Sequence, residues 1–166
     1  IDFIQIPTSL LSQVDSSIGG KTGVDFDSYK NMVGAFHMPK LVYMNLSVLK
    51  TLSNRQFCSG MGEIIKHGLI KNANYFTWLK ENEAQIAALD LLTVGEMIYD
   101  SNVVKKNVVE NDPTEKGERA LLNFGHTLGH AIEKYMNFEF LHGECVLIGC
   151  ALASIISYKK GNITQA

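Results

Sequence analysis

The sequence predicts a mainly α-helical protein, in which a helical bundle follows a small segment of strands and loops. Two observations support this fold class. From residue 53 onward, apolar residues recur every three or four positions between residues that typically begin or end helices. Before residue 53, short apolar runs surround a glycine-rich loop, as in strands joined by turns. We therefore expect two parts of different architecture, residues 1–52 and residues 53–166.

The first part contains two expected strands. One covers residues 1–7 (IDFIQIP), and the other covers residues 41–45 (LVYMN). Between them, residues 8–18 are expected to be helical in part. Residues 19–26 (GGKTGVDF) combine two adjacent glycines with a brief β-like run, which indicates a loop that leads into extended chain.

The second part contains about five expected helices. Ser53 is a favourable N-cap for the first helix, and Asn72 or Asn74 can begin the second. Thr93 is expected to open the third helix, which Pro113 ends because proline cannot continue a helix. In order, the expected helices cover residues 54–72, 75–89, 94–112, 121–133 and a last segment that follows residue 142.

Composition limits the classes of function. Apolar residues make up 46% and charged residues 19% of the chain, which suits a globular protein with a sizeable core. The net charge of −2 predicts no general affinity for nucleic acid or anionic membranes, so phosphate recognition requires a local basic cluster. No apolar run approaches the roughly 20 residues of a membrane span, and no signal peptide opens the chain. A cytoplasmic location is expected.

The cysteines and the chain ends add two expectations. Cys58, Cys145 and Cys150 lack paired spacing, so they are interpreted as small buried side chains in a reducing compartment. The chain opens directly on an apolar strand and stops soon after Gly161 ends its last helix. Both features suggest a fragment of a longer protein.

Residues 121–133 (LLNFGHTLGHAIE) carry the strongest chemical signal. His126 and His130 are four residues apart and therefore share one face of a helix. Together with His142 and the distant Glu63, they form a ligand set for a divalent metal that keeps one coordination position open. Spacing alone favours His126 and His130 as the ligand pair. Two histidines satisfied within the helix are the alternative.

Glu63, Lys66 and His67 lie at helix positions i, i+3 and i+4 and so share one face. Most of their neighbours in GMGEIIKHG are small or apolar. A surface ion pair is the common interpretation of such a charged pair, but this setting predicts an inward-facing one. Buried charges need a partner or a metal.

Residues 15–21 (DSSIGGK) could bind an anion through backbone N–H groups, hydroxyls and the Lys21 ammonium. A purely structural turn is the alternative. Lys30 and Asn31 form a further polar pair in an apolar stretch. Lys66, Lys105 and Arg119 could join the lysines of this region around one pocket, which would suit a small substrate with a phosphate and a carboxylate.

Taken together, five motifs resemble a known family. IPTSLLSQVDSSIGGKTGVD, KNMVGAF, GMGEIIKHG, RALLNFGHTLGHAIE and LHGE are similar in order and spacing to 3-dehydroquinate synthase. The resemblance covers nearly the whole chain but lacks the family's N-terminal nucleotide-binding part. It implies a two-domain α/β + α enzyme. Residues 1–52 would be the end of the NAD-binding domain with the substrate and cofactor loop, and residues 53–166 the helical metal- and substrate-binding domain.

The resemblance also implies roles for individual residues. The metal, Zn²⁺ or Co²⁺, would be held by Glu63, His126 and His142, with His130 beside it as a hydrogen-bonding and proton-transfer group. The substrate's phosphate, carboxylate and hydroxyls would be held by Lys21, Asn31, Lys66, Lys105, Arg119 and Asn123. The boundary with NAD would involve Thr8, Ser9, Asp15, Lys21 and Lys30.

The implied reaction converts 3-deoxy-D-arabino-heptulosonate 7-phosphate into 3-dehydroquinate and phosphate, the second step of the shikimate pathway. NAD would oxidise one secondary alcohol transiently, phosphate would leave by elimination, and reduction and an aldol step would close the ring. The family implies a homodimer. A sister sugar-phosphate cyclase, an NAD-dependent metal alcohol dehydrogenase and a non-catalytic metal-binding helical module are the alternatives. The isolated fragment is expected to be inactive, because most of the cofactor site is missing.

Overall fold

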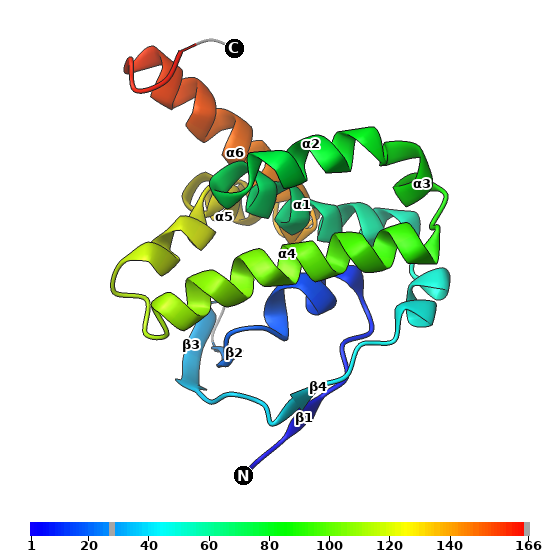
Figure 1. Cartoon of the computed structure of the whole chain (residues 1–166). Coiled ribbons are helices and arrows are strands. Elements are labelled where there is room, and N and C mark those ends of the chain that lie inside the picture. The colour runs from blue at the N-terminus through cyan, green and yellow to red at the C-terminus, as the bar shows by residue number, and fades with distance from the viewer. Residues whose placement is uncertain (27–28, 165–166) are drawn as a thin grey trace.

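The computed structural model describes residues 1–26 and 29–164, without the side chains of residues 25 and 29–31. It is mainly helical, as predicted, with the strands gathered near the N-terminus and the long helix α4 crossing the bundle (Figure 1). The elements are β1 (Ile4–Gln5), η1 (Ser12–Ser16), β2 (Lys21–Phe26), β3 (Tyr29–Phe36), β4 (Leu41–Val42), η2 (Leu46–Thr51), α1 (Asn54–Lys71), α2 (Ala73–Glu81), α3 (Glu83–Ala87), α4 (Leu91–Asn111), η3 (Glu118–Asn123), α5 (His126–Tyr135) and α6 (His142–Lys159).

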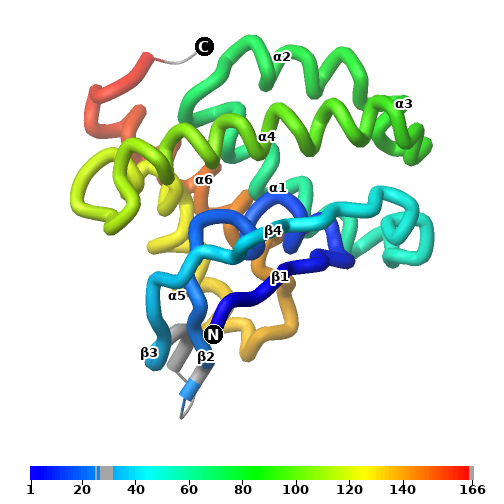
Figure 2. The backbone as a smooth tube through the Cα atoms, turned by 60° about the horizontal axis from the view of Figure 1, so that its bottom comes forward, coloured from blue at the N-terminus to red at the C-terminus, as the bar shows by residue number. Residues whose placement is uncertain are grey.

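The strands form two small pairs, which come forward in Figure 2. β1 and β4 are parallel, with Ile4 opposite Leu41, and β2 and β3 form an antiparallel hairpin. The predicted strands 1–7 and 41–45 are thus shorter than expected, because a strand extends only as far as its partner does. Strand β3 was missed, since its YKNMVGAF sequence lacks strict alternation and its order comes from pairing with β2.

The first two helix starts follow the prediction. The Ser53 hydroxyl accepts a hydrogen bond from the Gln56 N–H at 3.4 Å, and the Asn72 side chain accepts one from Tyr75 at 3.0 Å. These contacts satisfy backbone donors that have no partner inside the helix. The second predicted helix is divided in two, because the chain leaves helical geometry at Asn82 (φ −105°, ψ 13°).

The start of the third predicted helix was wrong. Asp90, and not Thr93, caps α4, and its carboxylate accepts from the Thr93 N–H at 3.0 Å. Asp90 lies in extended geometry, which an N-cap requires, whereas Thr93 is already helical. The end is as predicted, with α4 stopping at Asn111 before Pro113.

The histidine helix begins later than expected. Residues 118–123 form the tight turn η3, and α5 starts only at His126, after Gly125 adopts a left-handed φ of +80°. A Cβ atom on Gly125 would lie 2.5 Å from the Cys150 sulfur, so the position also requires the absence of a side chain. This bend places the first turn of α5 against α6.

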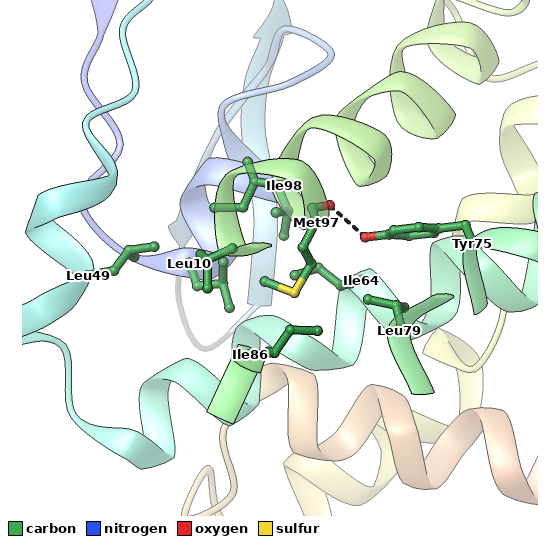
Figure 3. Close-up of a cluster of buried hydrophobic side chains, with 10 residues drawn as sticks. Leu10, Leu49, Ile64, Tyr75, Leu79, Ile86, Met97 and Ile98 are labelled. Atoms are coloured by element: carbon green, nitrogen blue, oxygen red, sulfur yellow. Dashed lines mark hydrogen bonds between the residues drawn. The ribbon is translucent and has the colours of Figure 1, made fainter. Parts of the chain in front are cut away.

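The main hydrophobic core lies between α1, α2, α3 and α4 and the turns η1 and η2. Figure 3 shows how these side chains converge, with the Tyr75 hydroxyl donating to the Met97 carbonyl oxygen at 2.6 Å. The core holds Glu63 rigidly, because the next residue, Ile64, is fully buried in it. Its buried members are Leu10, Val14, Leu49, Ile64, Tyr75, Leu79, Ile86, Val94, Met97 and Ile98.

The cysteine interpretation holds for two positions. Cys145 and Cys150 are buried, whereas Cys58 is exposed on α1, contrary to the prediction. The helical face on which Cys58 lies could not be assigned from spacing alone. Among the described residues, no helix combines the length and apolar character that crossing a membrane would require.

Replacing Tyr75 by Phe tests the core contact. We expect Tyr75→Phe to lower the free energy of unfolding by about 1 kcal/mol, because a buried hydrogen bond is lost while the packing stays. Urea unfolding followed by circular dichroism measures this change. Tyr99→Phe is the matched control, since Tyr99 is exposed on α4. Equal effects of the two substitutions would contradict the assignment.

Candidate metal centre

Three helices bring together the side chains that sequence analysis proposed as metal ligands. Glu63 comes from the middle of α1, whereas His126 and His142 are the first residues of α5 and α6. The Glu63 Oε1 atom lies 3.6 Å from Nε2 of His126 and 3.4 Å from Nε2 of His142. Tetrahedral ligands about 2.1 Å from a zinc ion stand about 3.4 Å apart. Both distances from Glu63 therefore fit a metal ligand set, and ligand atoms of the three residues all lie within 4.8 Å of one another.

The polar contacts of Glu63 also fit a cation. Its side chain is 0% exposed, and Oε2 accepts a hydrogen bond from the Lys66 ammonium. Oε1 is buried and has no hydrogen-bond partner within the part of the chain that the structure describes. An unpaired buried carboxylate oxygen is costly. A cation between Oε1 and the two imidazoles would remove that cost.

His126 is prepared to act as a ligand. Its Nδ1 atom lies 3.3 Å from the carbonyl oxygen of Phe124, and donation from Nδ1 leaves the Nε2 lone pair toward Glu63. Burial, aided by the Lys66 ammonium, lowers the pKa of His126 from its usual value. The shift favours the neutral imidazole that metal binding requires.

The charged pair predicted to face inward does so. Glu63 and Lys66 are both almost fully buried, and Lys66 also donates to the Leu122 carbonyl oxygen at 2.7 Å. Burial alone would raise the pKa of Glu63, but contacts with His142 and Lys66 outweigh it and hold that pKa well below its usual range. Glu63 is thus ionised at neutral pH.

His130 has a different position from the other histidines. Its ring centroid lies 5.3 Å from that of His126 and 5.8 Å from that of His142, and the side chain is exposed at the cavity. Among the described residues, His130 shares a set of close ligand atoms with Glu133 and His142, and not with Glu63 and His126. The pairing of His126 with His130 suggested by spacing is therefore the less favourable ligand set.

His67 is buried one turn beyond Glu63. Its Nδ1 atom contacts the Ser101 hydroxyl of α4 at 2.8 Å, and Nε2 has no hydrogen-bond partner among the described residues. Burial, with the nearby Lys66 charge, lowers the pKa of His67 to about 3. His67 thus remains a neutral side chain that joins α1 to α4.

A cavity of about 590 Å³ lies beside the metal centre. This volume is typical of sites for small molecules. The wall is formed by the β2–β3 hairpin, the end of η1, α4, η3 and the starts of α5 and α6. It brings together nine residues of the predicted site, which are Asp15, Lys21, Lys66, Lys105, Arg119, Asn123, His126, His130 and His142.

The lysines of the cavity are already paired with carboxylates. Lys105 contacts Asp15, and Lys21 contacts Glu115, which sequence analysis missed. Glu115 also accepts a hydrogen bond from Asn123 Nδ2 at 2.7 Å. Although partial burial would raise the pKa of Glu115, the hydrogen bonds from Lys21 and Asn123 lower it. An incoming anion would therefore compete with the Glu115 carboxylate for Lys21 and Asn123.

Arg119 differs from the lysines in its partners. The side chain is 2% exposed, and its guanidinium donates to the carbonyl oxygens of Gly19 at 3.0 Å and Pro113 at 2.8 Å. Its hydrogen bonds thus go to neutral acceptors, and its positive charge acts on the nearby Glu115 and Asp112 carboxylates and on the cavity that it lines. Gly19 has a left-handed φ of +104°, and a Cβ atom there would lie 2.7 Å from the Arg119 guanidinium. The glycine loop thus has a structural role in seating Arg119.

Some predicted residues lie elsewhere. Thr8 is exposed and does not line the cavity. Ser9, also outside the cavity lining, exchanges hydrogen bonds with Ser12 at the start of η1. The side chains of Lys30 and Asn31 lie outside the described residues. Glu115 could not have been found from sequence, because a charged residue in the loop 112–117 is normally solvated.

A carboxylate and two imidazoles beside a pocket lined by lysine and arginine are the types of group that bind a divalent metal and an anionic substrate. The comparisons with known proteins specify the family. The family model described as 3-dehydroquinate synthase C-terminal matches residues 60–166, and the one described as 3-dehydroquinate synthase N-terminal matches residues 1–59. The chain belongs to the 3-dehydroquinate synthase family.

Individual relatives agree with this result. The chain is 49% identical to 3-dehydroquinate synthase of Aliivibrio fischeri over its whole length, which covers 46% of that protein. It is 53% identical to the Clostridium botulinum enzyme over 97% of its length and 46% of the relative. The chain therefore spans about half the length of the curated relatives that it matches.

Solved structures show the same fold in related cyclases. The 2-epi-5-epi-valiolone synthase ValA of Streptomyces hygroscopicus, with NAD⁺ and Zn²⁺ bound, has a TM-score of 0.90 at 30% identity, over 99% of this chain and 46% of that one. A 2-deoxy-scyllo-inosose synthase complexed with carbaglucose-6-phosphate, NAD⁺ and Co²⁺ has a TM-score of 0.89 at 30% identity, over 99% of this chain and 45% of that one.

Histidine variants separate the two ligand hypotheses. We expect His126→Ala to weaken Co²⁺ binding by more than about 100-fold, beyond the 10- to 100-fold effect typical of residues that only support a ligand. His130→Ala should weaken it by less than about tenfold, because His130 lies outside the Glu63 ligand set. Competition with a chromophoric chelator measures both affinities. Equal losses would favour the pairing of His126 with His130.

His67 predicts a pH dependence of stability. The unfolded imidazole takes up a proton near pH 6.5, whereas the folded one stays neutral until about pH 3, so the unfolded state binds more protons in between. Stability should therefore fall with decreasing pH in this window, with a contribution of up to about 1.4 kcal/mol per pH unit. Urea unfolding from pH 7 to pH 4.5 should show this slope in the parent and a shallower one in His67→Gln. Identical slopes would contradict the assignment.

Proposed function

We propose that this chain carries the metal- and substrate-binding half of a 3-dehydroquinate synthase, which converts 3-deoxy-D-arabino-heptulosonate 7-phosphate into 3-dehydroquinate and phosphate. The observation that carries the proposal is the convergence of Glu63, His126 and His142 at the edge of a cavity lined by lysine and arginine. Identity of about 50% to synthases of this name supports the choice of reaction.

The proposed centre assigns a role to each ligand. Glu63, His126 and His142 would hold a divalent cation, with Zn²⁺ or Co²⁺ suggested by the related structures. When bound, the cation would supply Lewis acidity and NAD would supply hydride transfer. Lys66 keeps the Glu63 carboxylate ionised and oriented through its hydrogen bond to Oε2. His130, which is exposed at the cavity, would exchange a proton with a bound hydroxyl.

The remaining cavity residues would bind the anionic groups of the substrate. Arg119 is the best candidate for phosphate or carboxylate, because its polar partners are neutral carbonyl oxygens. Lys21 and Asn123 would become available when the substrate displaces Glu115. Lys105, which contacts Asp15 in the cavity lining, would add positive charge to the pocket. The role of Asn31 in substrate binding stays a prediction.

Fewer structural observations support the assignments of residues to NAD binding. Asp15 and Lys21 line the cavity, in keeping with a position between substrate and NAD. Thr8, Ser9 and Lys30 stay predictions for the NAD boundary. The same holds for the division into residues 1–52 and 53–166, for a homodimer and for a cytoplasmic location. The family implies that most of the NAD site belongs to the half of the relatives that this chain does not span.

The alternatives differ in measurable ways. A sister cyclase shares the fold, but the two related cyclases described above are 30% identical to the chain, against about 50% for the synthases. An NAD-dependent alcohol dehydrogenase would form NADH without releasing phosphate. A structural metal module would close its site with a fourth protein ligand, whereas among the described residues the Glu63 set contains three.

A chimera tests the proposal. Fusing this chain to the N-terminal half of the Aliivibrio fischeri synthase should restore phosphate release from the heptulosonate phosphate, in dependence on NAD⁺ and Zn²⁺. We expect Glu63→Gln in the chimera to lower this rate more than about 100-fold, because the charged metal ligand is lost. The 166-residue chain alone should show no turnover.

Three outcomes would contradict the proposed reaction. Phosphate release from glucose 6-phosphate, and not from the heptulosonate phosphate, would favour a sister cyclase. NADH formation without phosphate would favour a dehydrogenase. Full activity of the Glu63→Gln chimera would show that this metal centre is not needed for catalysis.

A further inference from the structure

One face of α1 contacts the start of α6 at three successive turns. Arg55, Ser59 and Glu63 are four residues apart and therefore lie in a row along the helix. Each of them meets one of the first three residues of α6. Arg55 contacts Glu144, Ser59 contacts Gly143, and Glu63 lies 3.4 Å from His142. The row that ends at the metal centre thus begins at an ion pair two turns away.

The ion pair has the geometry of a clamp. Arg55 Nε and one terminal nitrogen donate to the two carboxylate oxygens of Glu144, both at 2.8 Å. The same terminal nitrogen donates to the Glu139 carbonyl oxygen at 2.8 Å. Glu144 in turn accepts from the Leu141 N–H at 2.7 Å. Because Leu141, the N-cap of α6, has no polar side chain, these contacts secure the first turn of the helix.

The middle contact leaves little space for movement. The Gly143 N–H donates to the Ser59 hydroxyl at 3.1 Å. A Cβ atom on Gly143 would lie 1.7 Å from the Ser59 carbonyl oxygen, so the two backbones touch. A small tilt of α6 about Gly143 would change the distance between Glu63 and His142.

We propose that Arg55 is a positioning residue for the metal centre, because its clamp on Glu144 and Glu139 sets the position of His142 relative to Glu63. This inference rests on the proposed metal site. Arg55 and Glu144 are partly exposed, at 55% and 29%, and an exposed ion pair contributes little to global stability. We therefore expect loss of Arg55 to change the geometry of the ligand set and to change the free energy of unfolding only slightly.

Cobalt binding to the 166-residue chain tests this role. We expect Arg55→Ala to weaken Co²⁺ binding by about tenfold or more and to alter the d–d absorption of the bound ion, as do changes in groups that orient metal ligands. Far-ultraviolet circular dichroism and the thermal midpoint of the metal-free chain should stay close to those of the parent. The absorption band reports ligand geometry, which a purely structural role would leave unchanged.

Three further variants complete the design. Arg55→Lys keeps the positive charge but cannot form the bidentate contact with Glu144. Glu144→Gln keeps a hydrogen-bond acceptor for the Leu141 N–H but removes the negative charge. Both should weaken Co²⁺ binding less than Arg55→Ala does. They also carry the test if Arg55→Ala fails to fold. Lys106→Ala, which removes an exposed ion pair with Glu110 on α4, is the matched control and should bind Co²⁺ as the parent does.

Different results would contradict the positioning role of Arg55 and the metal centre itself. If folded Arg55→Ala has the parent's Co²⁺ affinity and absorption spectrum, the positioning role is wrong and the metal centre stands. The same conclusion follows if Arg55→Ala is unfolded and both milder variants match the parent. If the parent chain binds no Co²⁺, the metal centre itself is wrong.

Discussion

The buried carboxylate of Glu63 is the constraint on which the site depends. One oxygen is held by Lys66, and the other faces two imidazoles without a hydrogen-bond partner among the described residues. A carboxylate so far from water is tolerated only with strong positive partners. One such partner is Lys66, one turn away in the same helix, and the other would be a bound cation. The three helices that meet at this point supply the groups that surround this charge.

The close packing of α1 and α6 makes this meeting possible. Gly143 lets the first turn of α6 approach the backbone of α1 near Ser59, so that His142 reaches Glu63. Gly125 performs the same function for α5, because its left-handed conformation turns the chain just before His126. The candidate ligands His126 and His142 are thus placed by close backbone contacts at or just before the starts of α5 and α6. Such contacts are stiffer than those of long side chains.

The charges around the cavity show how an anion-binding site can exist in a chain of slightly negative net charge. Each lysine of the cavity wall has a carboxylate partner, which limits repulsion between the cations before an anion binds. Arg119 is the exception, with carbonyl partners in two loops. Electrostatic preference for an anion would therefore come from Arg119 and from the exchange of Glu115 for the substrate.

The sequence by itself determined the mainly helical class, the cap at Ser53 and the inward-facing pair of Glu63 and Lys66, because helix periodicity and capping are local. It limited the second cap to Asn72 or Asn74, of which the structure has Asn72. It also supplied the ligand types. Spacing within one helix favoured the pair of His126 and His130, whereas the family resemblance implied Glu63, His126 and His142. Only the tertiary structure decided which groups converge, since their distances depend on how α1, α5 and α6 pack. The contacts of Arg55 with Glu144 and of Glu115 with Lys21 were likewise decided by the tertiary structure, because they join residues that are distant in the sequence.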